Sequence, residues 1–182
     1  MDCHHLFGIA KTAYERAKEN AEELTSGRAD AIVAMLFSAA TLEAFIGEFA
    51  ERAHNTGSDT AKHIADVLGE LEENRASLRV KFLVLSELLG KRAYTKGSQP
   101  YQDFDLLINI RNTIVHMKPE SLKFEPDNIV KDFQSRGLCA RPVKKPTITT
   151  DDLPHLIRDI ATPAAARWAC GPAIGASRDG IP

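Results

Sequence analysis

The sequence predicts an all-α protein, a single helical bundle of five or more helices with an irregular segment after residue 118. Apolar residues recur three or four positions apart over several long stretches, which is the spacing that places them on one face of a helix. Turn-forming residues separate these stretches. A chain of 182 residues is long enough for one domain with a substantial core. We therefore expect one helical domain over residues 1–170, an irregular region within it at 118–150, and a flexible tail at 171–182.

The composition is that of an ordinary soluble globular protein, with 43% hydrophobic and 26% charged residues. A formal net charge of -2 argues against a general nucleic-acid coat but leaves room for a local basic patch. The cysteines Cys3, Cys139 and Cys170 are odd in number and far apart, so no disulfide framework or CxxC metal site is implied. The first ten residues lack the basic start and apolar run of a secretory signal. We expect a cytoplasmic protein with free thiols.

Two helices are expected in the first third of the chain. The first runs from Leu6 to Leu24 with small apolar residues on one face, and Gly27 is expected to form a left-handed cap after it. The second begins after the capping residue Asp30 and runs to about Asn55. Its apolar window, 31–50, has about the length of a membrane span, but two glutamates and several polar residues interrupt it. We interpret it as a buried core helix.

Two shorter helices follow. The segments Asp59–Glu73 and Leu78–Ala93 have apolar residues at helical spacing, and a loop at 95–100 leads onward from them. Basic residues flank the second segment, a pattern that is usual for a solvated helix surface and that also suits a face contacting phosphates. These residues are Arg75, Arg79, Lys81, Lys91, Arg92 and Lys96.

The next helix, expected over Asp103–Glu120, carries the residues that suggest a function. Arg111 falls within its broad apolar arc, where an unpaired cation is costly, whereas Asn112 and His116 fall on the opposite, polar face. Glu43 falls within the apolar arc of the second helix. A buried carboxylate and a buried arginine in one small domain favour pairing, because each alone is costly. We therefore predict that Glu43 contacts Arg111.

The chain after residue 118 is less regular. We expect a short helix between Pro126 and Gly137, then a loop or a short edge strand, and then a helix over Asp151–Ala161. A last helix begins at Thr162-Pro163 and is expected to end at Gly171-Pro172, because glycine and proline together commonly stop a helix.

The spacing of Arg111, Asn112 and His116 suggests chemistry on a phosphodiester. A guanidinium offers several fixed donors to a phosphate, and an imidazole that titrates near neutral pH can move a proton. Together they suffice for metal-independent cleavage of RNA, in which the 2′-hydroxyl attacks the adjacent phosphate. Asn112 would orient His116 or hold a phosphate oxygen. Arg111 and His116 project about 140° apart on an ideal helix. They converge only if the arginine curls round, the helix distorts, or a second subunit completes the site.

The alternative interpretation is structural. Arg111 then forms a core ion pair with Glu43, His116 is an exposed residue near a helix end, and the protein is a non-catalytic module that binds RNA or protein. A third interpretation is a scaffold whose partner is encoded nearby. No metal or cofactor is predicted: Cys3-His4-His5 lies at a terminus without a partner cluster, and Asp151-Asp152 is better explained as a helix start.

The string Arg111-Asn112 followed three residues later by His116, in the penultimate long helix, resembles the signature of the HEPN superfamily (higher eukaryotes and prokaryotes nucleotide-binding domain). SAATLEAFIGE, at 38–48, is similar to the second core helix of that group. TPAAARWA, at 162–169, is similar to a closing helix in related bacterial sequences. The resemblance covers the chain from about residue 6 to residue 170.

This resemblance implies an all-α bundle of HEPN type that forms a homodimer, in which two motifs face a shared cleft. It implies a metal-independent endoribonuclease of a toxin–antitoxin, abortive-infection or other defence system, with RNA as substrate and an antitoxin or regulatory protein as a further partner. Arg111 and His116 would be catalytic, Asn112 would be the polar residue after the arginine, and Glu43 would be a supporting acid. Some members of the superfamily have lost activity and serve as RNA-binding or assembly modules.

Four lysines and arginines near the motif are candidate RNA-binding residues: Lys91, Arg92, Lys96 and Lys118. The last of them also marks a departure from the superfamily. HEPN toxins that are silenced by nucleotidylation carry a tyrosine two residues after the histidine, where this chain has Lys118. Regulation of that kind is therefore not expected.

Overall fold

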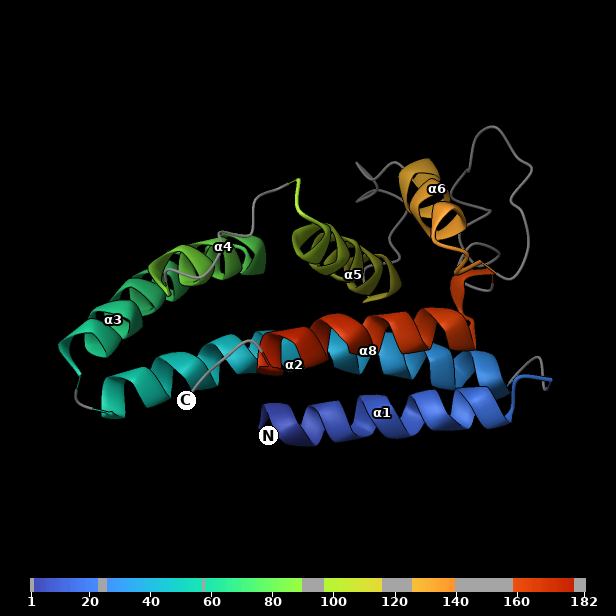
Figure 1. The fold of residues 1–182 in the computed structure, drawn as a ribbon, viewed down its shortest axis with the longest axis horizontal. Coiled ribbons are helices and arrows are strands. Elements are labelled where there is room, and N and C mark those ends of the chain that lie inside the picture. The colour runs from blue at the N-terminus through green and yellow to red at the C-terminus, as the bar shows by residue number, and fades with distance from the viewer. Residues whose placement is uncertain are drawn as a thin grey trace.

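The computed structural model describes residues 2–22, 26–56, 58–89, 97–115, 126–139 and 159–178. Every regular element in these ranges is a helix, which confirms the predicted all-α class. The helices, labelled as in Figure 1, are α1 (Cys3–Glu19), α2 (Ser26–Asn55), α3 (Asp59–Glu73), α4 (Leu78–Leu88), α5 (Gln99–Val115), α6 (Pro126–Ser135) and α8 (Pro163–Arg178).

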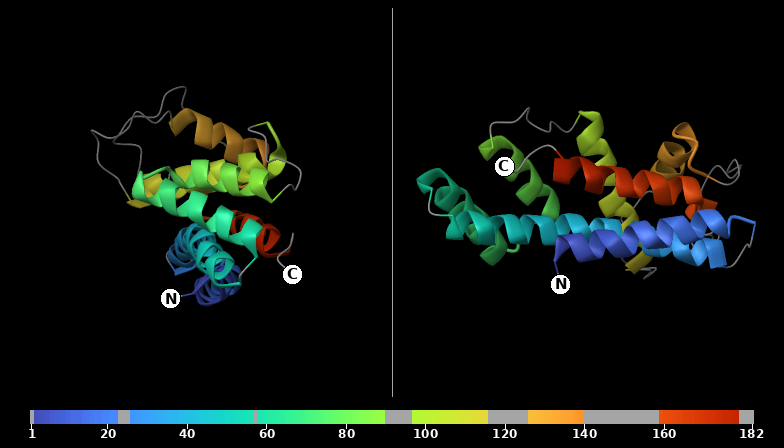
Figure 2. Two further views of the ribbon diagram at one scale, coloured as in Figure 1. Left: turned by 90° about the vertical axis from the view of Figure 1, so that its left-hand side faces the viewer. Right: turned by 60° about the horizontal axis from the view of Figure 1, so that its bottom comes forward.

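The long helix α2 lies at the centre of the arrangement. It runs lengthwise beside α1 and α8, and α5 crosses it, while α3 and α4 fold back beside its C-terminal end (Figure 1). The end-on view of Figure 2 places α1 below α2, α8 to its right, and α4 and α5 above it. The prediction that α2 is a core helix is therefore confirmed by its contacts with α1, α3, α4, α5 and α8.

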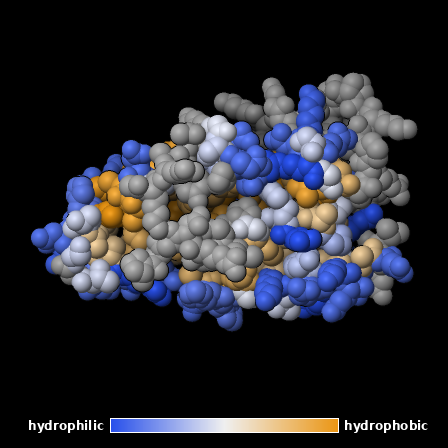
Figure 3. Space-filling view, in the orientation of Figure 1, coloured by the Kyte–Doolittle hydropathy of each residue, from blue (hydrophilic) through white to orange (hydrophobic). Residues whose placement is uncertain are grey.

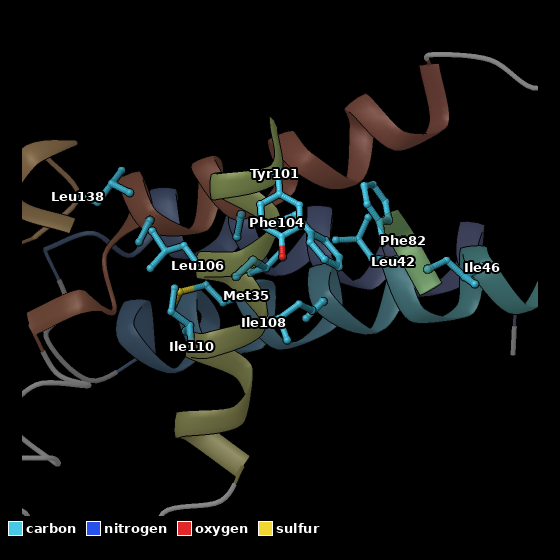
Figure 4. Packing of buried hydrophobic residues seen from close by; sticks show 14 of the residues in the cluster. Met35, Leu42, Ile46, Phe82, Tyr101, Phe104, Leu106, Ile108, Ile110 and Leu138 are labelled. Atoms are coloured by element: carbon cyan, nitrogen blue, oxygen red, sulfur yellow. The ribbon is translucent and has the colours of Figure 1, made fainter. Parts of the chain in front are cut away.

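The main core forms where α5 crosses α2 (Figure 4). Phe104 and Ile110 of α5 are almost completely buried with Met35 and Leu42 of α2. Phe104 also stacks on Phe82 of α4, with ring centroids 4.4 Å apart. Each such side chain stabilises the fold by roughly 1.5–3 kcal/mol when it is removed from water. This crossing therefore fixes where the C-terminal end of α5 lies.

The connection between α1 and α2 differs from the prediction. α1 ends at Glu19 with Asn20 as its C-cap, and Gly27 is not that cap. α2 already begins at Ser26, so Asp30 lies inside the helix. A Cβ atom at Gly27 would lie 2.5 Å from the carbonyl oxygen of Asn20. Glycine is thus required here by the close approach of two helices, and not by a left-handed backbone.

α3 begins and ends where the sequence predicted, and Ser58 caps its N-terminus by accepting a hydrogen bond from the backbone N–H of Ala61. α5 begins at Gln99, four residues before the predicted start. The expected continuation of α5 through Glu120 and most of the expected helix 151–161 lie outside the described residues.

α6 confirms the short helix predicted between Pro126 and Gly137. Gly137 follows it with φ +67°, a conformation that favours glycine. Asp103 of α5 joins this region to α8, because its carboxylate forms an ion pair with Arg136 and accepts a hydrogen bond from Nε1 of Trp168 at 3.4 Å. The Arg136 guanidinium also lies 5.7 Å from the centroid of the Trp168 ring.

The predicted end of the last helix is wrong. α8 begins at Pro163, as expected, but continues past Gly171-Pro172 to Arg178, so much of the segment predicted as a flexible tail is helical. Pro172 removes one backbone hydrogen bond from a helix interior. α8 nevertheless packs against both α1 and α2, and such packing commonly overrides local propensity.

The outer surface is uneven in polarity. Figure 3 shows hydrophilic side chains over the outer face of α1 and apolar ones at the end formed by α3 and α4, where Val80 is 42% exposed. α2 is apolar and long enough to cross a membrane by length and composition alone, and 44% of its most apolar window is buried. Soluble core helices pass the same test, so the cytoplasmic location stays a prediction.

Candidate functional site

The candidate site lies at the C-terminal end of α5, where the helix passes beyond the edge of α2 (Figure 4). Burial falls off along this last turn: Ile110 is fully buried, Ile114 is partly buried, and Val115 is 52% exposed. Arg111 and Asn112 lie at this boundary, and both are partly exposed. The site is therefore an edge of the bundle and not an internal pocket.

Arg111 contacts Glu43, as the two helical projections predicted. Nη2 of Arg111 lies 3.7 Å from Oε2 of Glu43, which joins α5 to α2. The predicted burial of this pair is wrong, because the Arg111 side chain is 37% exposed and the Glu43 side chain is 60% exposed. Arg111 falls on the same arc of α5 as the buried Phe104, but near the C-terminal end of the helix this arc is only partly covered.

Asn112 restrains the same guanidinium through its other terminal nitrogen. Its Oδ1 accepts a hydrogen bond of 3.0 Å from Nη1 of Arg111. A guanidinium has five N–H donors in a fixed plane, and among the described residues this bond and the ion pair with Glu43 occupy only part of them. The others can serve another ligand. An exposed, oriented guanidinium of this kind can bind a phosphate through two parallel hydrogen bonds.

A second polar network lies along α5, and the sequence did not predict it. Arg79 of α4 forms an ion pair with Asp105 and donates a 2.6 Å hydrogen bond to Oδ1 of Asn109. Nδ2 of Asn109 in turn lies 3.3 Å from Oδ2 of Asp105. The sequence pattern that could have predicted this network is the one-turn spacing of Asp105 and Asn109 on the polar face of α5. Arg79 thus fixes α4 to α5, and it is not free to contact phosphates as the basic flank suggested.

The same holds for a second residue of the basic flank. Lys81 forms an ion pair with Glu72 of α3, so its charge is also partnered within the fold. Lys91, Arg92, Lys96 and Lys118 lie outside the described residues, and so does His116. The structure therefore brings Arg111, Asn112 and Glu43 together, while the convergence of Arg111 with His116 stays a prediction.

The three cysteines are free thiols. Burial, together with a hydrogen bond from Sγ to the Glu48 carboxylate at 3.2 Å, raises the pKa of Cys3 to about 11. Burial also raises the pKa values of Cys139 and Cys170. These thiols are held in the protonated form, which is a poor nucleophile. Within the described ranges, no group of three or more His, Cys, Asp or Glu residues has the arrangement of a metal site.

Comparisons of the chain with protein-family models, with curated proteins and with solved structures found no match. The fold and the site therefore define the class of protein only broadly, as an all-helical protein with an oriented, partly exposed arginine at the edge of its bundle.

Proposed function

We propose that this protein is a metal-independent endoribonuclease of HEPN type, working as a homodimer in a toxin–antitoxin or abortive-infection defence system. The observation that carries the proposal is the state of Arg111. It is 37% exposed, lies 3.7 Å from Glu43 and donates to Asn112, so a cation is oriented at the surface. An arginine whose role was limited to the core would be expected to lie buried, as the structural interpretation assumed.

In the proposed reaction, His116 accepts the proton of the RNA 2′-hydroxyl as its oxygen attacks the adjacent phosphorus. The new bond is O2′–P and the broken bond is P–O5′, which leaves a 2′,3′-cyclic phosphate and a 5′-hydroxyl after the leaving oxygen takes a proton. Arg111 stabilises the charge that develops on the phosphoryl oxygens. Glu43 and Asn112 hold the guanidinium in position.

The homodimer supplies the second half of the site in this proposal. Arg111 and His116 project about 140° apart on one regular helix, so an arginine from one protomer and a histidine from the other would meet more readily than the two residues of one chain. RNA is the proposed substrate, and an antitoxin or regulatory protein is a proposed further partner.

The test is cleavage of RNA by the wild type and by the Arg111→Ala and His116→Ala variants, with growth arrest on expression as a second readout. Arg16→Ala is the matched control, because Arg16 is also an exposed arginine in an ion pair, with Asp30 at 3.1 Å, on a different helix. We expect both site variants to lose cleavage and Arg16→Ala to retain it. Equal cleavage by all four folded proteins would refute the assignment.

A second candidate function is a non-catalytic module that binds RNA or protein. The ion pair of Glu43 with Arg111 favours it, since this contact joins α2 to α5 and so contributes to the fold whether or not chemistry occurs. RNA binding by the wild type without any cleavage, lost in Arg111→Ala, would identify this function.

A further inference from the structure

One face of α2 is apolar and yet only partly covered. Four of its apolar side chains, Leu36, Phe37, Ala40 and Ala44, are neither fully buried nor fully exposed, and Gly47 on the same face is exposed. These five residues, here called the open face of α2, fall within about 100° of one another in helical projection. No charged residue interrupts this face between residues 33 and 47.

The neighbouring helices explain why this face stays open. On one flank, α1 contacts α2 through the Cys3 and Glu48 pair, and on the other flank α5 contacts it through Arg111 and Glu43. α8 packs against α2 as well. In the end-on view of Figure 2, α1 lies below α2, α8 lies to its right and α5 lies above it. No helix of the described chain lies on the remaining side of α2.

We propose that the open face of α2 is the surface through which two copies of this chain pair about a two-fold axis. A partly exposed apolar strip of this length on a central helix indicates an interaction surface, because soluble monomers seldom expose contiguous apolar patches. Ala40, Ala44 and Gly47 recur at helical spacing, so their small side chains allow the backbone of another helix to approach closely.

The charges at the margin of the open face favour a second copy as the occupant. Glu43 and Arg111 have opposite signs and lie side by side at this margin, with 60% and 37% of their side chains exposed. A two-fold axis presents the same patch to itself, so a contact of Glu43 with the partner's Arg111 is repeated by a contact of Arg111 with the partner's Glu43. A membrane surface or an unrelated protein would not require this reciprocal pair.

This inference names the face used by the homodimer of the proposed function, and in that respect it rests on that proposal. The pairing also brings the two Arg111 residues to one seam. Its test is separable, because assembly is measured without RNA. A dimer that cleaves nothing supports the interface and contradicts the nuclease activity. A monomer that cleaves RNA contradicts the interface and the dimeric site but leaves the proposed reaction standing.

The first experiment measures the mass of the full chain in solution by sedimentation equilibrium, for the wild type, Ala40→Arg and Ala164→Arg. Ala164 is the matched control, because it is an exposed alanine on α8, away from the open face. We expect the wild type and Ala164→Arg to be dimers and Ala40→Arg to have half their mass with unchanged helical content. A monomeric wild type, or an Ala40→Arg variant that stays dimeric, would overturn the proposal.

The second experiment uses charge reversal, which keeps the proposal testable if Ala40→Arg fails to fold. Glu43→Arg alone and Arg111→Glu alone each place like charges opposite one another in the pair, so each should be monomeric. Mixed in equal amounts, the two variants restore opposite charges at both contacts and should form a heterodimer. Failure of the mixture to associate, or binding of the wild type to phosphatidylcholine vesicles in place of self-association, would contradict pairing through this face.

Discussion

Removal of the Glu43 carboxylate by Glu43→Ala should lower stability only slightly, and the size of the loss follows from the exposure of the pair. Glu43 is 60% exposed, Arg111 is 37% exposed, and their charged atoms are 3.7 Å apart. Exposed pairs of this kind contribute roughly 0.2–1 kcal/mol, whereas breaking a buried pair costs roughly 3–5 kcal/mol. For a chain of this size, about 1 kcal/mol corresponds to a Tm decrease of roughly 2–4 °C.

The assay is a double-mutant cycle in urea, with the wild type, Glu43→Ala, Arg111→Ala and the double variant. The coupling free energy should fall within the range for an exposed pair and should vanish in about 1 M salt, where the screening length is only about 3 Å. A coupling of roughly 3 kcal/mol or more that persists at high salt would refute this reasoning, because it requires a pair shielded from water. The small expected loss also means that Arg111→Ala stays folded in cleavage assays.

Three further predictions concern the fold. Arg75 follows α3 with φ +53°, a left-handed conformation that is costly for a residue with a side chain. Arg75→Gly should therefore raise the free energy of unfolding in urea by about 1 kcal/mol, and an unchanged or lower value would contradict backbone strain at this position. Asp103→Ala removes the acceptor shared by Arg136 and Trp168, so it should lower the free energy of unfolding by about 1–3 kcal/mol and shift the tryptophan emission. An unchanged emission spectrum would contradict this prediction. Cys3 should alkylate slowly at pH 9 and faster as the pH rises through about 11, and Glu48→Gln should move this rise to lower pH. Since the folded pKa of this thiol exceeds its ordinary value of 9.0, its contribution to stability is complete below pH 9 and is lost as the pH approaches 11.

The sequence was most informative where local signals and packing agree. α3 has both predicted ends because Ser58 caps a segment whose apolar face, with Ile64 and Leu68, is buried. The contact of Glu43 with Arg111 could be predicted because each residue lay in the apolar arc of its own helix. Its exposure could not be predicted, since a projection treats a helix as uniformly covered and does not show which part of its face the neighbouring helices leave open.

The remaining differences have the same physical origin. α8 passes Pro172 because contacts with α1 and α2, distant in sequence, outweigh one missing hydrogen bond. Gly27 was assigned to the wrong helix, because the close approach of two backbones and a left-handed cap both select glycine. Arg79 was grouped with a solvated basic surface, although its partners Asp105 and Asn109 lie on another helix.

The central claim is that Arg111 participates in metal-independent cleavage of RNA. Its most direct test is to identify the product ends formed from a single-stranded RNA in EDTA by the wild type and by Arg111→Ala. We predict a 2′,3′-cyclic phosphate and a 5′-hydroxyl from the wild type, and no such products from the variant. Products with a 5′-phosphate, or the same cyclic phosphate released at an equal rate by Arg111→Ala, would contradict the claim.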